Sequence, residues 1–168
     1  MNYFAHTFET PMGSLLSVVD ENNALVLLTF CEDQPQAELI FAKEFRKACV
    51  AWDAGRNALV EAQLGEYFLG ERQAFTLPLQ AKGTEFQQRV WEALVNLPYG
   101  ETATYGKIAA ALGNPNASRA VGRANATNPI AIVVPCHRVI GAKGALTGYA
   151  FGLSRKERLL ELERKSAG

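Results

Sequence analysis

The sequence predicts an α+β protein of two domains: an N-terminal mixed α/β domain with an antiparallel sheet over residues 1–82, and a mostly helical C-terminal domain over residues 83–168. Two changes near residue 83 support this division. Apolar runs separated by turns fill the start of the chain, whereas helical spacing dominates after the boundary. The formal charge also changes, because six Lys and Arg stand against eleven Asp and Glu before the boundary (−5), and eleven stand against six after it (+5).

The N-terminal elements follow from local patterns. Three apolar runs alternate with turns and predict an antiparallel meander, at residues 3–8, 15–19 and 24–30. Charged and helix-forming residues over 35–47, and apolar residues at helical spacing over 59–68, predict two helices. Residues 76–79 are expected to form a short strand that leads into a linker near Lys82–Gly83.

The C-terminal domain is expected to open with an amphipathic helix. Thr84 is a suitable N-cap, and apolar residues follow it at helical spacing up to Leu94. Proline and glycine in the segment 97–100 end this helix in a turn. With 48% hydrophobic residues over 168 positions, the chain can bury a sizeable core.

The next two helices form a helix-turn-helix pattern. A short helix over 104–112 is followed by a turn containing Gly113 and Pro115, and then by a second helix over 117–124. Arg119 and Arg123 lie one turn apart and therefore share a face. This pattern and the basic charge of the domain favour a polyanionic partner, although a helical hairpin packed on the core has the same pattern.

The cysteine count and the chain start favour a reducing, cytoplasmic setting. Cys31, Cys49 and Cys136 cannot pair completely, and their spacing is not that of a zinc site or a disulfide framework. The first residues lack the order of a secretory signal, and no apolar run approaches membrane-spanning length. We therefore expect no metal, no cofactor and no association with a membrane.

The chemistry is concentrated around Cys136. The apolar run 130–134 is too short for a helix, so we expect a buried segment that delivers Cys136 to a fixed point. His137 and Arg138 create a positive environment, which favours the nucleophilic thiolate. A cysteine without such neighbours is more often a small buried hydrophobe, and we interpret Cys31 and Cys49 in this way.

Several motifs in this region occur together and in order: Asn128-Pro129, Pro135-Cys136-His137-Arg138, Gly148-Tyr149 and Arg155-Lys156-Glu157. With them, residues 83–162 closely resemble the active-site region of the O6-alkylguanine-DNA alkyltransferase family. The resemblance implies a ribonuclease H-like N-terminal domain and a winged helix-turn-helix in the C-terminal domain. It also implies DNA repair by one stoichiometric transfer of an alkyl group, mainly methyl, from O6 of guanine to Cys136 of a monomer. Transfer from O4 of thymine is expected as well.

The resemblance also implies a role for each matching residue. Cys136 is the alkyl acceptor, His137 removes its proton through a water, and Glu157 orients that histidine. Asn128 pins the turn that presents the cysteine, and Tyr105 donates a proton toward N3 of the leaving guanine. Taken singly, Glu157 is typical of a solvated helix face, Tyr105 of a core aromatic and Asn128 of a turn.

Contacts with double-stranded DNA follow from the same resemblance. The O6 atom of guanine is engaged in the base pair, so the base must leave the duplex before a sulfur atom can reach it. The second helix is expected to enter the minor groove, and Arg119 to fill the space of the extruded base, although a simple phosphate contact is the alternative. The other expected DNA contacts are Tyr105, Ala117, Ser118, Arg123 and Arg138, and the expected pocket residues are Val139, Tyr149, Ala150 and Phe151.

Three features depart from the family pattern. Phe151 stands where many members have glycine, and Arg158 stands where many have tryptophan. The cysteines and histidines that hold a structural zinc in some members are missing from the N-terminal half, which supports the expectation of no metal.

Two other classes of function fit parts of the pattern. One is a DNA-binding module without catalysis, either a helix-turn-helix regulator or an alkyltransferase-like protein that flags lesions; the presence of Cys136 argues against the latter. The other is a cysteine hydrolase that uses Cys136, His137 and Glu157. Neighbouring residues of an extended segment point to opposite sides, so proton transfer between Cys136 and His137 is easier through a water than directly.

Overall fold

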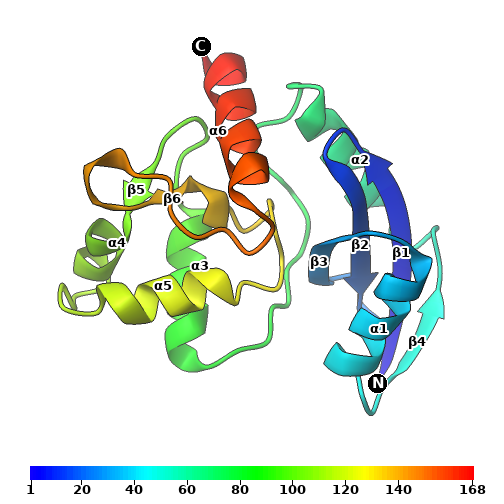
Figure 1. Ribbon diagram of the computed structural model, residues 1–168. Coiled ribbons are helices and arrows are strands. Elements are labelled where there is room, and N and C mark those ends of the chain that lie inside the picture. The colour runs from blue at the N-terminus through cyan, green and yellow to red at the C-terminus, as the bar shows by residue number, and fades with distance from the viewer. The chain divides into compact units, whose positions relative to one another are not determined.

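The computed structural model describes residues 1–168, and the chain falls into two compact units, Met1–Ala81 and Lys82–Gly168 (Figure 1). The boundary lies one residue from the position expected from the sequence. None of the helices in the chain is both long enough and apolar enough to cross a membrane.

The first unit is a four-stranded sheet with two helices. Its elements are β1 (Asn2–Thr10), β2 (Gly13–Val19), β3 (Leu25–Cys31), α1 (Gln34–Glu44), β4 (Cys49–Trp52) and α2 (Ala58–Phe68). The strand order is β3-β2-β1-β4, with antiparallel pairing from β1 to β3. The meander and both helices are confirmed.

The antiparallel meander is joined by β4, a strand that the sequence did not predict and that pairs with β1 in parallel. At four residues, β4 is too short to show a clear alternating pattern in the sequence. The short strand expected at residues 76–79 is not formed. These residues make one isolated bridge, between Leu79 and Leu25.

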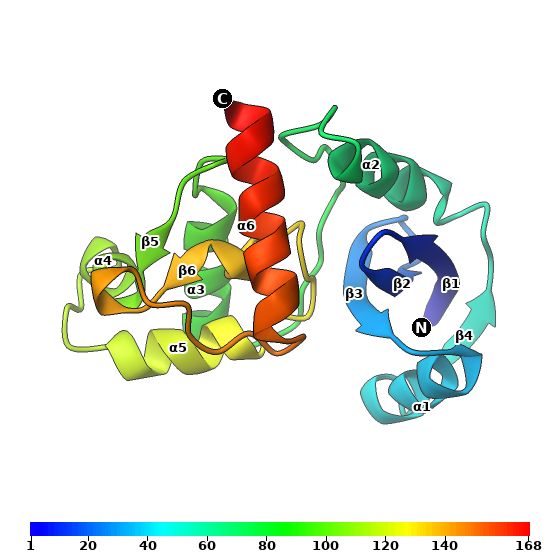
Figure 2. The ribbon, with the colours of Figure 1, turned by 45° about the horizontal axis from the view of Figure 1, so that its top comes forward.

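The two helices cover opposite faces of this sheet (Figure 2). Tyr3, Ala5 and Leu16 form a core cluster with Ala37 of α1 on one face. Side chains at the alternate positions face the other way, as the period of a strand requires.

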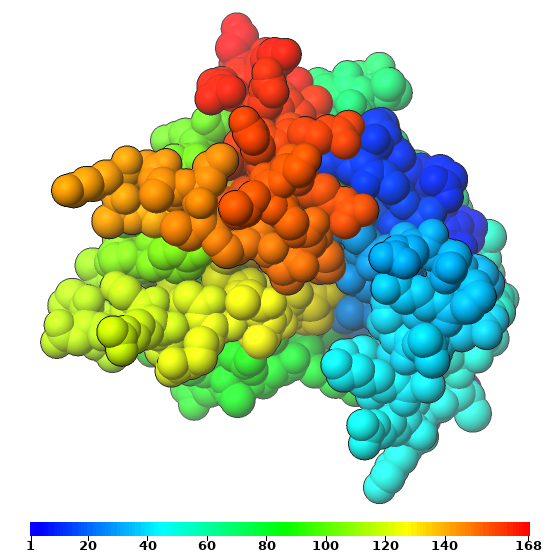
Figure 3. All heavy atoms as spheres, in the orientation of Figure 1, coloured from blue at the N-terminus to red at the C-terminus, as the bar shows by residue number.

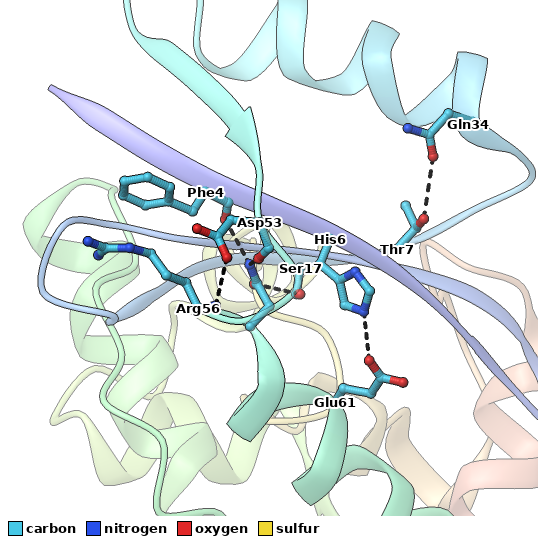
Figure 4. A network of polar contacts seen from close by, with 9 residues as sticks. Phe4, His6, Thr7, Ser17, Gln34, Asp53, Arg56 and Glu61 are labelled. Carbon is cyan, nitrogen blue, oxygen red and sulfur yellow. Dashed lines mark hydrogen bonds and ion pairs between the residues drawn. The ribbon is translucent and has the colours of Figure 1, made fainter.

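A polar network on the second face holds the start of α2 (Figure 4). The buried Asn57 accepts a hydrogen bond from Ser17 Oγ at 2.7 Å and donates to the carbonyl of Phe4 at 3.1 Å. Farther along α2, Glu61 Oε1 lies 2.6 Å from His6 Nε2. These contacts fix the helix to the sheet, and they satisfy the buried amide of Asn57.

The second unit is mostly helical. Its elements are α3 (Glu85–Val95), β5 (Ala103–Thr104), α4 (Tyr105–Ala111), α5 (Ser118–Ala126), the 3-10 turn η1 (Cys136–Arg138), β6 (Val139–Ile140), the 3-10 turn η2 (Ala142–Gly144) and α6 (Leu153–Ala167). Thr84 caps α3 in a reciprocal capping box with Gln87. The helix-turn-helix of α4 and α5 is confirmed, and β5 and β6 form a short parallel pair beside it.

Candidate active site

Cys136 lies at the first position of η1, with 4% of its surface exposed. The residues from Ile130 to Val134 are buried, as the sequence predicted. They are not extended, however. The N–H of Val133 donates to the carbonyl of Ala131 at 2.7 Å around Ile132, whose φ of 71° is rare for a β-branched residue. The N–H of Cys136 donates to the carbonyl of Val134 at 2.7 Å, so tight turns deliver the thiol.

Asn128 holds these turns in place. Its Nδ2 donates to the carbonyls of Ile130 at 3.2 Å and Val134 at 2.8 Å, while its Oδ1 accepts from the N–H of Ile130 at 3.0 Å. Three hydrogen bonds from one buried amide fix the backbone on both sides of the tight turn. The structure therefore places Asn128 where the resemblance implied, against the segment that presents Cys136.

The thiol of Cys136 is not a stable thiolate. Burial raises the pKa of this thiol, and a hydrogen bond from Asn128 and the positive charge of Lys156 offset that effect only in part. The expectation of a lowered pKa is wrong because the residues that prompted it supply little net charge. Burial lowers the pKa of His137, which is neutral, and the charge of Arg138 is paired. The thiol therefore needs a base.

His137 is suited to be that base. It is completely buried, and its Nε2 lies 2.6 Å from Oε2 of Glu163. Burial opposes ionisation of Glu163, but hydrogen bonds from His137 and Arg138 and the positive charge of Arg138 outweigh it and hold the pKa of Glu163 at about 2. Because an ionised carboxylate only accepts, Nε2 carries the hydrogen and Nδ1 carries the lone pair. Nδ1 is buried and has no hydrogen-bond partner in the structure.

The assignment of Glu157 as the carboxylate that orients His137 is wrong, because Glu163 occupies that position. Glu157 is exposed, whereas Lys156, Leu159 and Glu163 form the buried face of α6. Their spacing of three and four residues is the signal in the sequence that distinguishes the two glutamates. Arg158 is exposed as well, whereas Glu163 is buried.

The expectation that Arg138 contacts DNA is also wrong, because only 5% of its surface is exposed. Its Nε donates to Oε1 of Glu163 at 2.7 Å, and its terminal nitrogens donate to Oε2 of Glu163 at 3.1 Å and to the carbonyl of Leu97 at 2.7 Å. The planar guanidinium thus holds the carboxylate in two places and links it to the end of α3.

The sequence interpretation gave no role to Lys156 and did not consider Asn125. Lys156 is fully buried, and its Nζ donates to the carbonyls of Val139 at 2.5 Å and Thr147 at 2.6 Å. It therefore ties the loop 141–152 to the strand that follows η1. Asn125 is buried on α5 and donates from Nδ2 to the carbonyl of Cys136 at 3.3 Å.

The four expected pocket residues lie around this loop and strand. Val139 is buried in β6, and Tyr149 is buried with its ring edge-on to that of Phe151 at 5.3 Å between centroids. Phe151 is half-buried and Ala150 is exposed. Burial raises the pKa of Tyr149 well above its ordinary value, and the hydroxyl has no hydrogen-bond partner in the structure.

The expected DNA contacts on the helix-turn-helix lie together. Tyr105 begins α4, its hydroxyl accepts a hydrogen bond from Thr147 Oγ1 at 3.4 Å, and its ring lies over Gly122. Arg119 and Arg123 are exposed on α5, and Ala117 and Ser118 are half-buried at its start. In the space-filling view, α5 and the loop 141–152 share one face of this unit (Figure 3).

Comparisons with known proteins agree with this arrangement. Residues 85–165 match the model of a family described as 6-O-methylguanine DNA methyltransferase, DNA binding domain. A methylated-DNA–protein-cysteine methyltransferase of Methanosarcina acetivorans is 50% identical over 163 residues, covering 96% of this chain and 97% of its own. The constitutive enzyme of that name from Bacillus subtilis is 47% identical over 167 residues, covering 99% and 98%.

A solved structure extends the similarity to both units. The O6-methylguanine methyltransferase of Mycobacterium tuberculosis superposes with a TM-score of 0.84 at 43% identity, covering 99% of this chain and 95% of that one. The structure of the same relative in complex with DNA has a TM-score of 0.82 at the same identity, with coverage of 99% and 94%. With its sequence matched over nearly its whole length, the chain belongs to the methylated-DNA–protein-cysteine methyltransferase family.

Proposed function

We propose that this protein repairs DNA by moving the alkyl group from O6 of a guanine, and also from O4 of thymine, to the sulfur of Cys136. The observation that carries the proposal is the buried series Cys136, His137 and Glu163, in which a neutral imidazole presents an unpaired Nδ1. A protonated thiol next to such a base can be activated at the moment of reaction.

The transfer follows from these groups. The thiol proton passes through a water to Nδ1 of His137, and Glu163 stabilises the imidazolium that forms. The thiolate then attacks the alkyl carbon: an S–C bond forms, the O6–C bond breaks, and its electron pair passes into the guanine ring. The hydroxyl of Tyr105 donates a proton to guanine N3, which improves the leaving group. The positive charge of Lys156 favours the thiolate.

The product explains why each molecule acts once. A thioether has no carbonyl that water could attack, so nothing in the site restores the thiol. A cysteine hydrolase would instead need an acyl intermediate and a second step. We therefore favour a single transfer over hydrolysis.

DNA binding belongs to the same proposal. The basic face of α5 enters the minor groove of double-stranded DNA, the target base is extruded, and Arg119 fills its place. We propose that the protein acts as a monomer. Because the acceptor must be a free thiol, the proposal includes a location in the reducing cytoplasm.

One experiment tests the transfer directly. The protein is incubated with duplex DNA that contains O6-methylguanine, and the masses of its tryptic peptides are measured by mass spectrometry. We expect one methyl group per protein molecule, on the peptide that contains Cys136, and no transfer to the Cys136→Ala variant, which still binds DNA. More than one equivalent of repaired base per protein would contradict a single-use acceptor.

A further inference from the structure

Asn125 connects the helix that is proposed to bind DNA with the backbone of the acceptor cysteine. It is 4% exposed, and its Nδ2 donates to the carbonyl of Cys136 at 3.3 Å. That contact fixes the orientation of the amide, because a carbonyl can only accept and must face the NH2 group. The other end of the amide, Oδ1, is therefore an acceptor, and it has no hydrogen-bond partner in the structure.

A second buried acceptor belongs to His137, the residue that follows Cys136. Nδ1 of His137 carries a lone pair and also has no partner. A buried polar atom without a hydrogen bond is costly, and two acceptors cannot satisfy each other. The thiol of Cys136 offers one hydrogen, which is too few for both. A water molecule offers two hydrogens and can also accept one from the thiol.

We propose that Asn125 is a positioning residue for the transfer: its Oδ1 and Nδ1 of His137 together hold the water that receives the thiol proton of Cys136. This inference rests on the proposed function and adds to it a side chain from α5. With one hydrogen of the water on Asn125 and the other on His137, the water oxygen turns a lone pair toward the thiol. The relay is thereby aligned before the base arrives.

Asn125 lies on the same helix as the two arginines that are proposed to contact DNA. Arg119 and Arg123 project from the exposed face of the same nine-residue helix, while Asn125 occupies its buried face. The proposed DNA-contacting side chains and the residue that positions the proposed proton relay are therefore parts of one helix.

Four charged or titratable groups face the same site: Glu163, Arg138, Lys156 and Tyr149. A neutral substitution at Asn125 leaves all four in place. Its effect on the rate should therefore report the contacts of the Asn125 amide and not a change of local charge. Dependence of that effect on pH separates the water contact from the hydrogen bond to the carbonyl of Cys136.

The test compares Asn125→Leu, which has similar volume and no polar atoms, with Asn96→Leu at an exposed position of the same unit. Transfer is measured in a single turnover with saturating O6-methylguanine duplex between pH 6 and 9.5, alongside the dissociation constant for DNA. For Asn125→Leu we expect transfer about tenfold slower at neutral pH and an unchanged dissociation constant. The deficit should shrink as the pH rises, because a growing fraction of the thiol ionises without the relay. Asn96→Leu should behave as the wild type at every pH.

An undiminished rate at neutral pH, or a deficit of equal size at every pH, would overturn the role of Asn125 as a positioning residue. A second measurement does not depend on the variant folding. In a high-resolution crystal structure of the wild-type protein, a water should lie within hydrogen-bonding distance of Asn125 Oδ1, His137 Nδ1 and Cys136 Sγ, and its absence there would refute the inference. If the wild type transfers no methyl group, the proposed function fails instead, and the crystal structure still decides the water site.

Discussion

His137 and Glu163 form a fully buried pair, with Nε2 of the imidazole 2.6 Å from Oε2 of the carboxylate. Arg138, the next residue along η1, binds the same carboxylate through its other oxygen at 2.7 Å. The carboxylate of Glu163 is thus bound by two consecutive residues of a single turn, His137 and Arg138. This explains how a carboxylate with little contact with solvent remains ionised.

Replacing Glu163 with Gln should slow the transfer by about 100-fold, because the imidazolium that forms on His137 loses its counter-charge. The change also leaves Arg138 buried without its partner, which costs about 3–5 kcal/mol of stability. Single-turnover transfer and urea unfolding measure the two effects. Glu157→Gln is the matched control on the same helix and should change the rate by less than twofold. Similar losses in both variants would contradict the placement of Glu163.

Acid should destabilise the protein through the same pair. The pKa of Glu163 is held at about 2, below its ordinary value of 4.5, so the folded state binds fewer protons than the unfolded state between these values. Its contribution is present above pH 4.5 and is lost as the pH falls toward 2. The pKa of His137 is also lowered, from 6.5, so its contribution is likewise lost as the pH falls below 6.5.

The urea midpoint measured from pH 7 to pH 3 should therefore fall continuously. In Glu163→Gln the decline below pH 4.5 should be shallower, since the group that titrates there is gone. A wild-type midpoint that stays constant down to pH 3 would refute this linkage.

The sequence predicts the acceptor Cys136 better than the carboxylate that orients its base. Cys136, His137 and Asn128 lie within ten residues, so a local motif suffices to place them. Glu163 lies 26 residues beyond His137 on a helix where two glutamates compete, and only the buried spacing of Lys156, Leu159 and Glu163 separates them. A motif reports residue order, whereas the facing of a helix depends on what packs against it.

The fold shows the same division between local and distant information. Strand patterns, caps and turns predicted the meander and the start of α3, because each depends on neighbouring residues. The parallel pairing of β4 with β1 depends on a contact between residues nearly fifty positions apart. The role of Arg138 was missed for a related reason. A basic side chain next to a reactive cysteine suggests a ligand contact, and only the tertiary structure reveals its buried partner.

Lys156→Met should loosen the loop 141–152. The substitution leaves the carbonyls of Val139 and Thr147 without their donor, at a cost of about 1–3 kcal/mol for each that remains buried. We expect lower stability in urea and faster cleavage by chymotrypsin within the loop. Lys143→Met, at an exposed position of the same loop, should have neither effect. Equal cleavage rates in the two variants would show that Lys156 does not hold the loop.

Phe151 should limit the size of the alkyl group. Its half-buried ring packs edge-on against Tyr149 at the expected pocket, where a smaller residue would leave room for a bulky substituent. Phe151→Gly should raise the ratio of benzyl to methyl transfer by about one to two decades, which corresponds to relief of about 1–3 kcal/mol of crowding. The ratio is measured with O6-benzylguanine and O6-methylguanine substrates. If it does not change, the ring faces away from the substrate.

Arg119 and Arg123 should differ in what they contribute, although both are exposed on α5. Arg123→Ala should weaken DNA binding and reduce the slope of log affinity against log salt by about one, as loss of a phosphate contact requires. Arg119→Ala should reduce the transfer rate more than the affinity, because its proposed place is inside the base stack. Filter binding and single-turnover transfer separate the two. Identical effects of both substitutions would reduce Arg119 to a phosphate contact.

The burial of Cys136 also determines how the protein survives before it meets damage. Oxidants and electrophiles in solution react with accessible thiolates, whereas this thiol is protonated and 4% exposed. Cys49 is exposed on β4 and should react first with such reagents. Under the proposed mechanism a spent molecule cannot be regenerated, so premature oxidation would waste it. A thiol that stays protonated and buried until an alkylated guanine enters the pocket gives the unused protein a long working life.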